Sequence, residues 1–346
     1  MKKKQATIKD IARELKISHS TVSRALSEDR KVSALVAEKT RKRVRQKADE
    51  LDYSPNLMAQ GFVTGKTGTL GVQTYRIFQE LYAYQADQVL RTAGEQGYQV
   101  LIATMTSPHD LRSTSTPEDQ IRQLKQLLSR GIDGLFIHTR GDEEESERIW
   151  NTVRGRVPVV TFPYPTQNLS GVVEDAMANY YEATEHLIRL GHERIGFIGA
   201  DWNQNQVGSA KAKGYLLAMQ KHGLTPKRIP GKTFPKKPTH RLGKRLADRF
   251  TALVCREDYT ALIACRGLWE AGFRVPDDVA VIGNGNLEVA KYTTPALTTL
   301  AIPFEKIAQT AMELMLEQLE GEETPRQITV RSPLIVRESC GAKSRK

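Results

Sequence analysis

Residues 7–26 read TIKDIARELKISHSTVSRAL and contain two helical patterns separated by a short turn. Apolar residues recur at helical spacing through the first half, at Ile8, Ile11, Ala12 and Leu15. Thr7 stands where a helix N-cap would stand, and Ser18 holds the same place before the second pattern. We therefore expect two short helices, each of which buries one face.

The second of these helices has a polar outer side. Its inner stripe consists of Val22, Ala25 and Leu26. The residues that point outward are His19, Ser20, Thr21, Ser23 and Arg24. Side chains of these types can reach base edges in a major groove, so the stretch predicts a helix-turn-helix that reads DNA. An ordinary pair of amphipathic helices is the alternative for so short a match.

Charge supports the DNA interpretation. Residues 1–66 hold 16 Lys and Arg against 8 Asp and Glu, whereas residues 67–342 hold 32 against 32. The tail adds Lys343, Arg345 and Lys346. A basic segment on a neutral body is typical of phosphate contact. Six cations crowd one predicted helix, at Lys39, Arg41, Lys42, Arg43, Arg45 and Lys47. Val44, Ala48 and Leu51 form its apolar face, and its basic face either contacts phosphates or is simply solvated.

The chain resembles the lac repressor (LacI/GalR) family of bacterial transcription regulators over nearly its whole length. Matching pieces occur in the family's order at residues 21–24, 53–56, 64–72, 185–192, 270–279 and 294–299. One departure is about four extra residues between Ser33 and Thr40, close to one helical turn. The resemblance implies DNA contact from the residues already named on the second helix, and from Thr7, the cap of the first.

A short segment at 54–62 resembles the family's hinge helix. Ser54 and Pro55 suit a helix start, but so few residues do not hold a helix by themselves in water. The resemblance implies that this segment orders over DNA and inserts into the minor groove. The residues that it assigns there are Asn56, Ala59, Gln60 and Phe62. Phe62 replaces the usual leucine, and packing on the core is its alternative role.

From Leu70 onward, short apolar runs alternate with helical patterns, which predicts parallel sheets with helical crossovers. The first set of strands is expected at 70–74, 100–104, 134–138 and 158–162, and the second at 171–173, 194–199, 252–255 and 279–283. The expected fold class is α/β, with an N-terminal all-α helix-turn-helix domain before a periplasmic-binding-protein-like core of two doubly wound parallel-sheet lobes. The expected division is a helix-turn-helix domain at 1–53, a hinge and linker at 54–68, a core at 69–340 and a basic tail at 341–346. Within the core we expect lobe 1 at 69–168 and 298–325, and lobe 2 at 169–297 and 326–340.

Other classes of protein find little support. No apolar run is long enough for a membrane helix and no secretory signal is present, so we expect a cytoplasmic protein. Cys255, Cys265 and Cys340 fit buried free thiols rather than a disulfide framework or zinc site. His186 and His192 lie six residues apart, which is off the helical metal-ligand spacing and favours structural roles. No catalytic constellation, nucleotide-binding loop, metal site or cofactor site is predicted.

The resemblance also implies a small effector bound between the two lobes. The candidate contacts, chosen by their positions near strand ends, are Tyr75, Arg76, Tyr82, Phe162, Asp175, Trp202, Lys211, Arg256, Glu257 and Asn286. This site departs from the family pattern, because Lys211 replaces an arginine and Gly285 replaces an aspartate. Two effector classes stay open. One is an anionic sugar held by Lys211, Arg256 and Arg76; the other is a neutral saccharide held by Asn286, Asp175 and Trp202.

Together these patterns predict a homodimeric or tetrameric regulator that acts as a repressor on a palindromic double-stranded operator. The alternatives are control by a protein co-regulator and a solute-binding or enzymatic α/β protein with a tethering N-terminus. The core is expected to carry the dimer contacts. Helix 305–319, with Ile307, Ala311, Leu314 and Met315, contributes to them or else packs on its own sheet.

Overall fold

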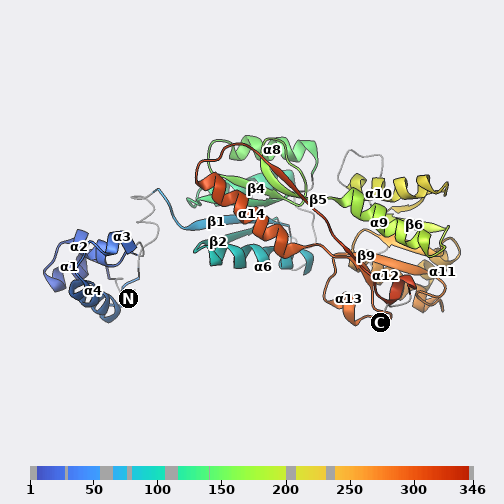
Figure 1. Cartoon of the computed structure of the whole chain (residues 1–346), viewed down its shortest axis with the longest axis horizontal. Coiled ribbons are helices and arrows are strands. Elements are labelled where there is room, and N and C mark those ends of the chain that lie inside the picture. The colour runs from blue at the N-terminus through green and yellow to red at the C-terminus, as the bar shows by residue number, and fades with distance from the viewer. Residues whose placement is uncertain are drawn as a thin grey trace. The chain divides into compact units, whose positions relative to one another are not determined.

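The structure is a computed structural model, and it describes residues 6–27, 30–54, 65–75, 80–105, 116–139, 141–199, 208–230 and 238–342. The chain divides into two compact units, Met1–Thr67 and Gly68–Lys346. The first is purely helical where it is described and the second contains both sheets (Figure 1). None of the helices in the described ranges combines the length and hydropathy needed to span a membrane.

The first unit begins with the two predicted helices. They are α1 (Ile8–Leu15) and α2 (His19–Ala25), followed by α3 (Arg30–Ser33) and α4 (Glu38–Glu50). The hydroxyl of Thr7 accepts a hydrogen bond from the backbone N–H of Asp10, whose carboxylate accepts the N–H of Thr7 in return. Ser18 caps α2 by accepting the N–H of Thr21 at 3.1 Å. Both predicted caps are confirmed.

The core of this unit is small and continuous. Its buried side chains are Ile11, Ala12, Val22, Ala25, Val36, Val44 and Ala48. They come from both halves of the predicted helix pair and from the apolar face of α4, as the spacing predicts. The stretch between Ser33 and Thr40 consists of the turn after α3 and the first residues of α4.

The second unit contains two six-stranded sheets. The first has the order β11-β5-β4-β3-β1-β2, and its strands are β1 (Thr69–Thr74), β2 (Gln99–Thr104), β3 (Gly134–His138), β4 (Val159–Phe162), β5 (Ser170–Glu174) and β11 (Gln327–Val330). The second has the order β12-β10-β9-β8-β6-β7, with β6 (Ile195–Gly199), β7 (Lys227–Pro230), β8 (Ala252–Cys255), β9 (Ala280–Asn284), β10 (Thr298–Leu300) and β12 (Leu334–Ile335). All pairings are parallel except that of β10 with β12, so the predicted doubly wound class is confirmed.

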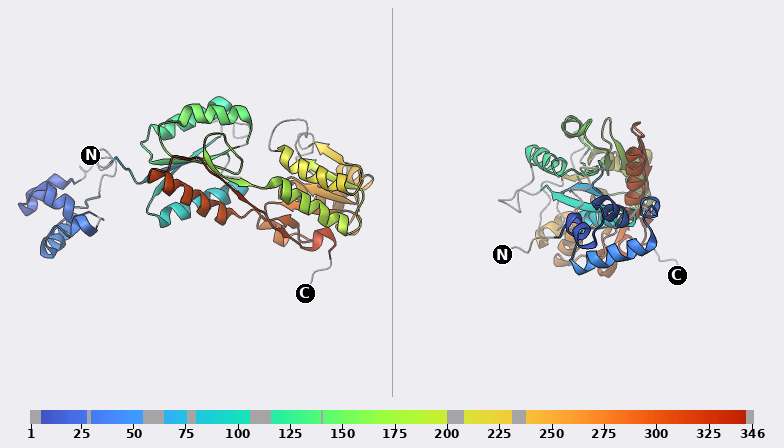
Figure 2. Two further views of the ribbon diagram at one scale, coloured as in Figure 1. Left: turned by 45° about the horizontal axis from the view of Figure 1, so that its top comes forward. Right: turned by 90° about the vertical axis from the view of Figure 1, so that its left-hand side faces the viewer.

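Helices cover both faces of each sheet (Figure 2). On the first sheet, one face is covered by α6 (Glu80–Glu95) and α14 (Phe304–Leu319), and the other by α7 (Pro117–Leu128) and α8 (Glu143–Val153). On the second, one face is covered by α9 (Ala176–Arg189) and α10 (Gly208–Lys221), and the other by α11 (His240–Ala247) and α12 (Asp258–Glu270). The short α13 (Val289–Tyr292) follows β9, and a 3-10 turn (Glu338–Cys340) closes the described chain.

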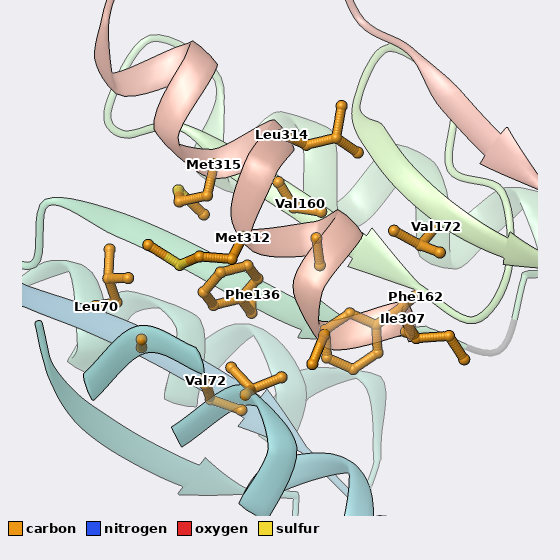
Figure 3. Packing of buried hydrophobic residues seen from close by; sticks show 14 of the residues in the cluster. Leu70, Val72, Phe136, Val160, Phe162, Val172, Ile307, Met312, Leu314 and Met315 are labelled. Carbon is orange, nitrogen blue, oxygen red and sulfur yellow. The ribbon is translucent and has the colours of Figure 1, made fainter. Parts of the chain in front are cut away.

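Helix α14 packs on its own sheet rather than presenting its apolar stripe to another molecule. Ile307, Ala311, Leu314 and Met315 are all buried, and Figure 3 shows the last of them beside the strands that carry Leu70 and Phe136. Of the two roles that the sequence left open for this stripe, the structure therefore selects core packing.

The predicted division into lobes needs correction. Strand β5 was expected in the second lobe, but it pairs with β4, and β11 pairs with β5, so both belong to the first sheet. Strand β10 was expected in the first lobe, but it pairs with β9. The chain thus crosses between the lobes after Glu174, after Leu300 and after Val330. Hydrophobic patterns identify strands without identifying the sheet that each one joins, which is why the boundaries were wrong.

Candidate functional site

The outward face of α2 is available for contact. His19, Ser20, Ser23 and Arg24 are exposed, whereas Val22 and Ala25 on the opposite side are fully buried. Thr21 is only half-buried, and its hydroxyl lies 2.8 Å from that of Ser18. The helix therefore presents a short polar stripe that ends in a guanidinium group.

A basic face on α4 adds to this surface. Lys42 pairs with Glu38 at 3.2 Å, and Lys47 pairs with Glu50. Within the described residues, no carboxylate lies within ion-pair distance of the other four cations, which are Lys39, Arg41, Arg43 and Arg45. Unneutralised cations of this kind suit a polyanion such as a phosphate backbone.

Several predicted site residues lie outside the described residues. They are Asn56, Ala59, Gln60 and Phe62 of the hinge segment, and Arg76 and Trp202 of the effector set. Thr7 is described and exposed, but its hydroxyl is engaged in the cap of α1.

In the second unit, aromatic rings gather at the carboxyl edge of the first sheet. Tyr75 follows β1, His138 ends β3, Phe162 ends β4, and Tyr82 lies near the start of α6. The ring centroids of Tyr75 and Tyr82 lie 5.0 and 4.8 Å from that of His138, both edge to face. Phe162 lies 5.8 Å from His138 and is almost fully buried, so it supports the cluster from below. The predicted Tyr75, Tyr82 and Phe162 are thus brought together.

His138 belongs to this cluster, although the sequence analysis did not select it. It is 4% exposed, burial lowers its pKa to about 3, and its Nδ1 has no hydrogen-bond partner among the described residues. The ring is therefore neutral at physiological pH. A histidine at a strand's carboxyl end was the available signal, but histidines were searched only for metal-ligand spacing.

A buried carboxylate positions Tyr75. Glu145 of α8 accepts hydrogen bonds from the Tyr75 hydroxyl at 3.2 Å and from the Gln120 side-chain amide at 3.0 Å. Its other oxygen accepts the backbone N–H of Gly141 at 3.2 Å. These contacts fix where the Tyr75 ring lies relative to the strand ends.

The second lobe supplies charges instead of rings. Lys211 on α10 lies 5.4 Å from the centre of the Tyr180 ring and donates to the carbonyl of Arg256 at 3.2 Å. No carboxylate lies within ion-pair distance of Lys211 among the described residues, and burial lowers its pKa. Arg256 pairs with Glu257 at 3.4 Å; burial opposes the charge, but Glu257 raises the pKa of Arg256 overall.

The two edges lie close enough to influence one another. Burial chiefly raises the pKa of Tyr164, just after β4 in the first lobe, but Arg256 and Glu257 of the second lobe also act on it. Tyr82 of the first lobe in turn acts on Arg256. Tyr164 was another residue that the sequence analysis missed. We call the region between the ring-bearing edge and the charge-bearing edge the interlobe cleft.

Two further candidates are already engaged by the chain. Asp175 caps α9 by accepting the N–H of Ala178 at 3.0 Å, and Arg331 approaches its carboxylate at 4.0 Å. The Asn286 side-chain oxygen accepts a hydrogen bond from Arg337 at 2.6 Å. Both residues lie near strand ends as predicted, but each already has one side-chain oxygen engaged in a hydrogen bond within the chain.

Gly285 stands where the family pattern has an aspartate, and the carboxylate of Asp258 lies beside it. Gly285 has a φ of 136°, and a Cβ there would lie 3.2 Å from a carboxylate oxygen of Asp258. Asp258 is fully buried and accepts the Thr299 hydroxyl at 2.6 Å and the backbone N–H of Leu287 at 2.8 Å. Its carboxylate thus holds the turn after β9.

Two families match this chain. Residues 7–56 match the family described as bacterial regulatory proteins, lacI family, and residues 184–340 match a periplasmic binding protein-like domain. These ranges contain the helix-turn-helix and most of the second lobe. The resemblance stated from the sequence is thereby confirmed.

Similar proteins cover nearly the whole chain. A protein named HTH-type transcriptional repressor PurR from Aliivibrio salmonicida is 28% identical over 344 residues, covering 96% of this chain and 97% of its own. A PurR from Aliivibrio fischeri is 29% identical over 343 residues, covering 96% and 98%. Among solved structures, a lac repressor dimer bound to operator and the anti-inducer ONPF has a TM-score of 0.84 at 22% identity, covering 97% of this chain and 99% of its own. A complex of the transcriptional regulator CelR with cellobiose has a TM-score of 0.64 at 25% identity, covering 97% and 100%.

Proposed function

Because the chain belongs to the lacI family of bacterial regulatory proteins, we propose that it represses transcription as a homodimer on a palindromic operator. It is a DNA-binding regulator controlled by a small molecule. We place that molecule in the interlobe cleft. We assign no catalytic reaction to the core, and we place the protein in the cytoplasm together with its DNA.

The outward face of α2 carries the DNA-binding part of the proposal. Four exposed polar side chains form a stripe on one side of α2, and the apolar side chains on its opposite side are fully buried. A helix of this kind has the shape and chemistry to read a major groove. We assign base contacts to His19, Ser20 and Arg24, with Thr21 and Ser23 beside them. We assign contacts with the DNA backbone to Thr7 and to the four cations of α4 that have no ion-pair partner among the described residues.

The cleft favours an anionic effector over a neutral one. Lys211 is a half-buried ammonium with no carboxylate of the described residues within ion-pair distance, and a charged ligand would supply a direct partner. The side chains proposed for a neutral saccharide, Asp175 and Asn286, each already have one oxygen engaged, in the cap of α9 and by Arg337. We therefore propose a phosphorylated or acidic sugar whose ring lies against Tyr75 and Tyr82 and whose charge meets Lys211.

The dimer contact is assigned to the edge of the first sheet. Strand β2 ends the sheet, and Leu101 and Ile102 on it are 39% and 40% exposed. Tyr84 and Leu90 on the adjacent α6 are similarly exposed. An edge strand with partly exposed apolar side chains is a template for association, and a second copy of this chain is the partner that a palindromic operator requires.

The test begins with the full chain and a randomised duplex library. We expect enrichment of one palindromic sequence, bound by two copies of the chain, with sedimentation as a dimer at micromolar concentration. Failure to enrich any sequence would overturn the proposal, as would a monomer on the enriched site. A thermal-shift screen of sugars, sugar phosphates and uronates then identifies ligands, because a bound effector raises the melting temperature by mass action.

A further inference from the structure

One carboxylate of the first lobe receives two hydrogen bonds from the second lobe. Glu80 lies at the start of α6, and its Oε2 accepts the hydroxyl of Tyr259 at 3.0 Å. Its Oε1 accepts the backbone N–H of Glu288 at 3.1 Å. Tyr259 belongs to the first turn of α12, and Glu288 immediately precedes α13.

The carboxylate of Glu288 does not compete for this contact. Its two oxygens accept the Tyr292 hydroxyl at 2.8 Å and the Lys291 ammonium at 2.7 Å, both from the adjacent helix. Only its backbone N–H is directed to Glu80. A charged acceptor shared between a hydroxyl and an amide forms stronger hydrogen bonds than a neutral acceptor would.

The contact adjoins the cleft on both sides. Tyr82 of the aromatic cluster lies two residues after Glu80 on the same helix. Tyr259 lies two residues after Glu257, and Glu288 lies two residues after Asn286. A ligand that changes the distance between the cleft edges must therefore move the same segments that form the hydrogen bonds of Glu80.

We propose that Glu80 is a positioning residue that latches this arrangement of the two lobes, and that operator affinity depends on whether the latch is made. The latch stabilises one lobe arrangement over others, so its loss shifts the population between them. The part concerning operator affinity rests on the proposed function. The latch itself stands on the geometry alone.

Hydrogen exchange of the full-length protein tests the latch at one amide. In Glu80→Ala, the N–H of Glu288 loses its acceptor and should exchange about tenfold faster than in the wild type. Glu80→Gln keeps an acceptor oxygen and should restore most of the protection. Glu144→Ala is the matched control, because this exposed acid of the same lobe pairs with Arg148 of its own helix. Unchanged exchange at Glu288 in Glu80→Ala would overturn the latch.

Fluorescence anisotropy on the enriched operator, without any added sugar, tests the consequence. We expect Glu80→Ala to change the operator Kd by about fivefold, and Glu144→Ala to leave it unchanged. Faster exchange with an unchanged Kd would overturn the dependence of operator affinity on the latch. If the wild type binds no operator, the proposed function fails, and the exchange experiment still decides whether the latch exists.

Discussion

The two polar surfaces of this chain are built in opposite ways. The outward face of α2 comes from one short run of residues, is exposed, and stands on a core that its side chains do not enter. The cleft is collected from strand ends far apart in the sequence, and Phe162 belongs both to its aromatic cluster and to the core of the first lobe. Changes in the first surface should therefore alter recognition alone, whereas changes in the second also alter packing.

Salt should separate the two surfaces most strongly. Raising the salt concentration from 50 to 200 mM should weaken operator binding by about a thousandfold, because counterions released from several phosphates must be recovered. Effector binding through one ammonium should change only a few-fold over the same range. Anisotropy and calorimetry on the wild-type protein measure both. A flat salt dependence of operator binding would contradict phosphate contact by α2 and α4.

Removing one cation from α2 should have the next largest effect. Arg24→Ala should weaken operator binding by about 1–3 kcal/mol at fixed salt, since a guanidinium on a base edge or phosphate is lost. Arg266→Ala removes the same charge from an exposed site on the core and should leave operator affinity unchanged. Equal losses in the two variants would show that net charge, rather than the α2 stripe, determines affinity.

The charge of the cleft can be examined with matched ligands. Calorimetry of each sugar against its phosphate or uronate should show tighter binding of the anionic member, and Lys211→Met should reduce that preference about tenfold. Operator affinity without ligand should stay unchanged in the variant. Tighter binding of the neutral member, unaffected by Lys211→Met, would show that the cleft recognises hydroxyls instead.

The smallest effect is expected outside both surfaces. Glu185 on α9 is buried, which would raise its pKa, but hydrogen bonds from Tyr181, His222 and Lys221 lower it to about 2. A carboxyl group whose pKa is lowered on folding stabilises the fold at pH values above its ordinary pKa of 4.5. This stabilisation is lost as the pH falls from 4.5 toward 2.

Denaturant unfolding of Glu185→Gln measures this contribution. At neutral pH, the free energy of unfolding of the wild type should exceed that of the variant by about 1 kcal/mol. The difference is small because Lys221 is well exposed, so that solvent screens its interaction with Glu185. The difference should shrink between pH 4.5 and the lowest pH at which the protein stays folded. If the difference in the free energy of unfolding stays constant across that pH range, it comes from packing rather than from the charge of Glu185.

Local signals made the first unit predictable. The caps at Thr7 and Ser18 depend on residues three positions away, and the buried and exposed stripes of α2 follow helical periodicity. The spacing that determines these contacts is contained within a few turns. The sequence therefore carried both the helix pair and the side chains on its outer face.

Pairing between distant strands was not predictable in the same way. Strands β5 and β11 look like any other strand in the sequence, yet each joins the first sheet through a neighbour that periodicity does not reveal. Strand β7, with the sequence KRIP at the edge of the second sheet, lacked an apolar run and was missed. Cleft residues such as His138 were missed because their roles come from neighbours on other strands.

The interrupted first lobe has a consequence for protein synthesis. Its core contains Leu70 and Phe136, but the covering side chains of α14 and Val330 of β11 come more than 150 residues later. The second lobe lies mostly between these two parts of the chain. During translation, the part of the first sheet that α14 covers and the edge of β5 must stay uncovered until α14 and β11 have left the ribosome. The lobe that begins first is thus completed late, which makes its nascent form a natural client for chaperones.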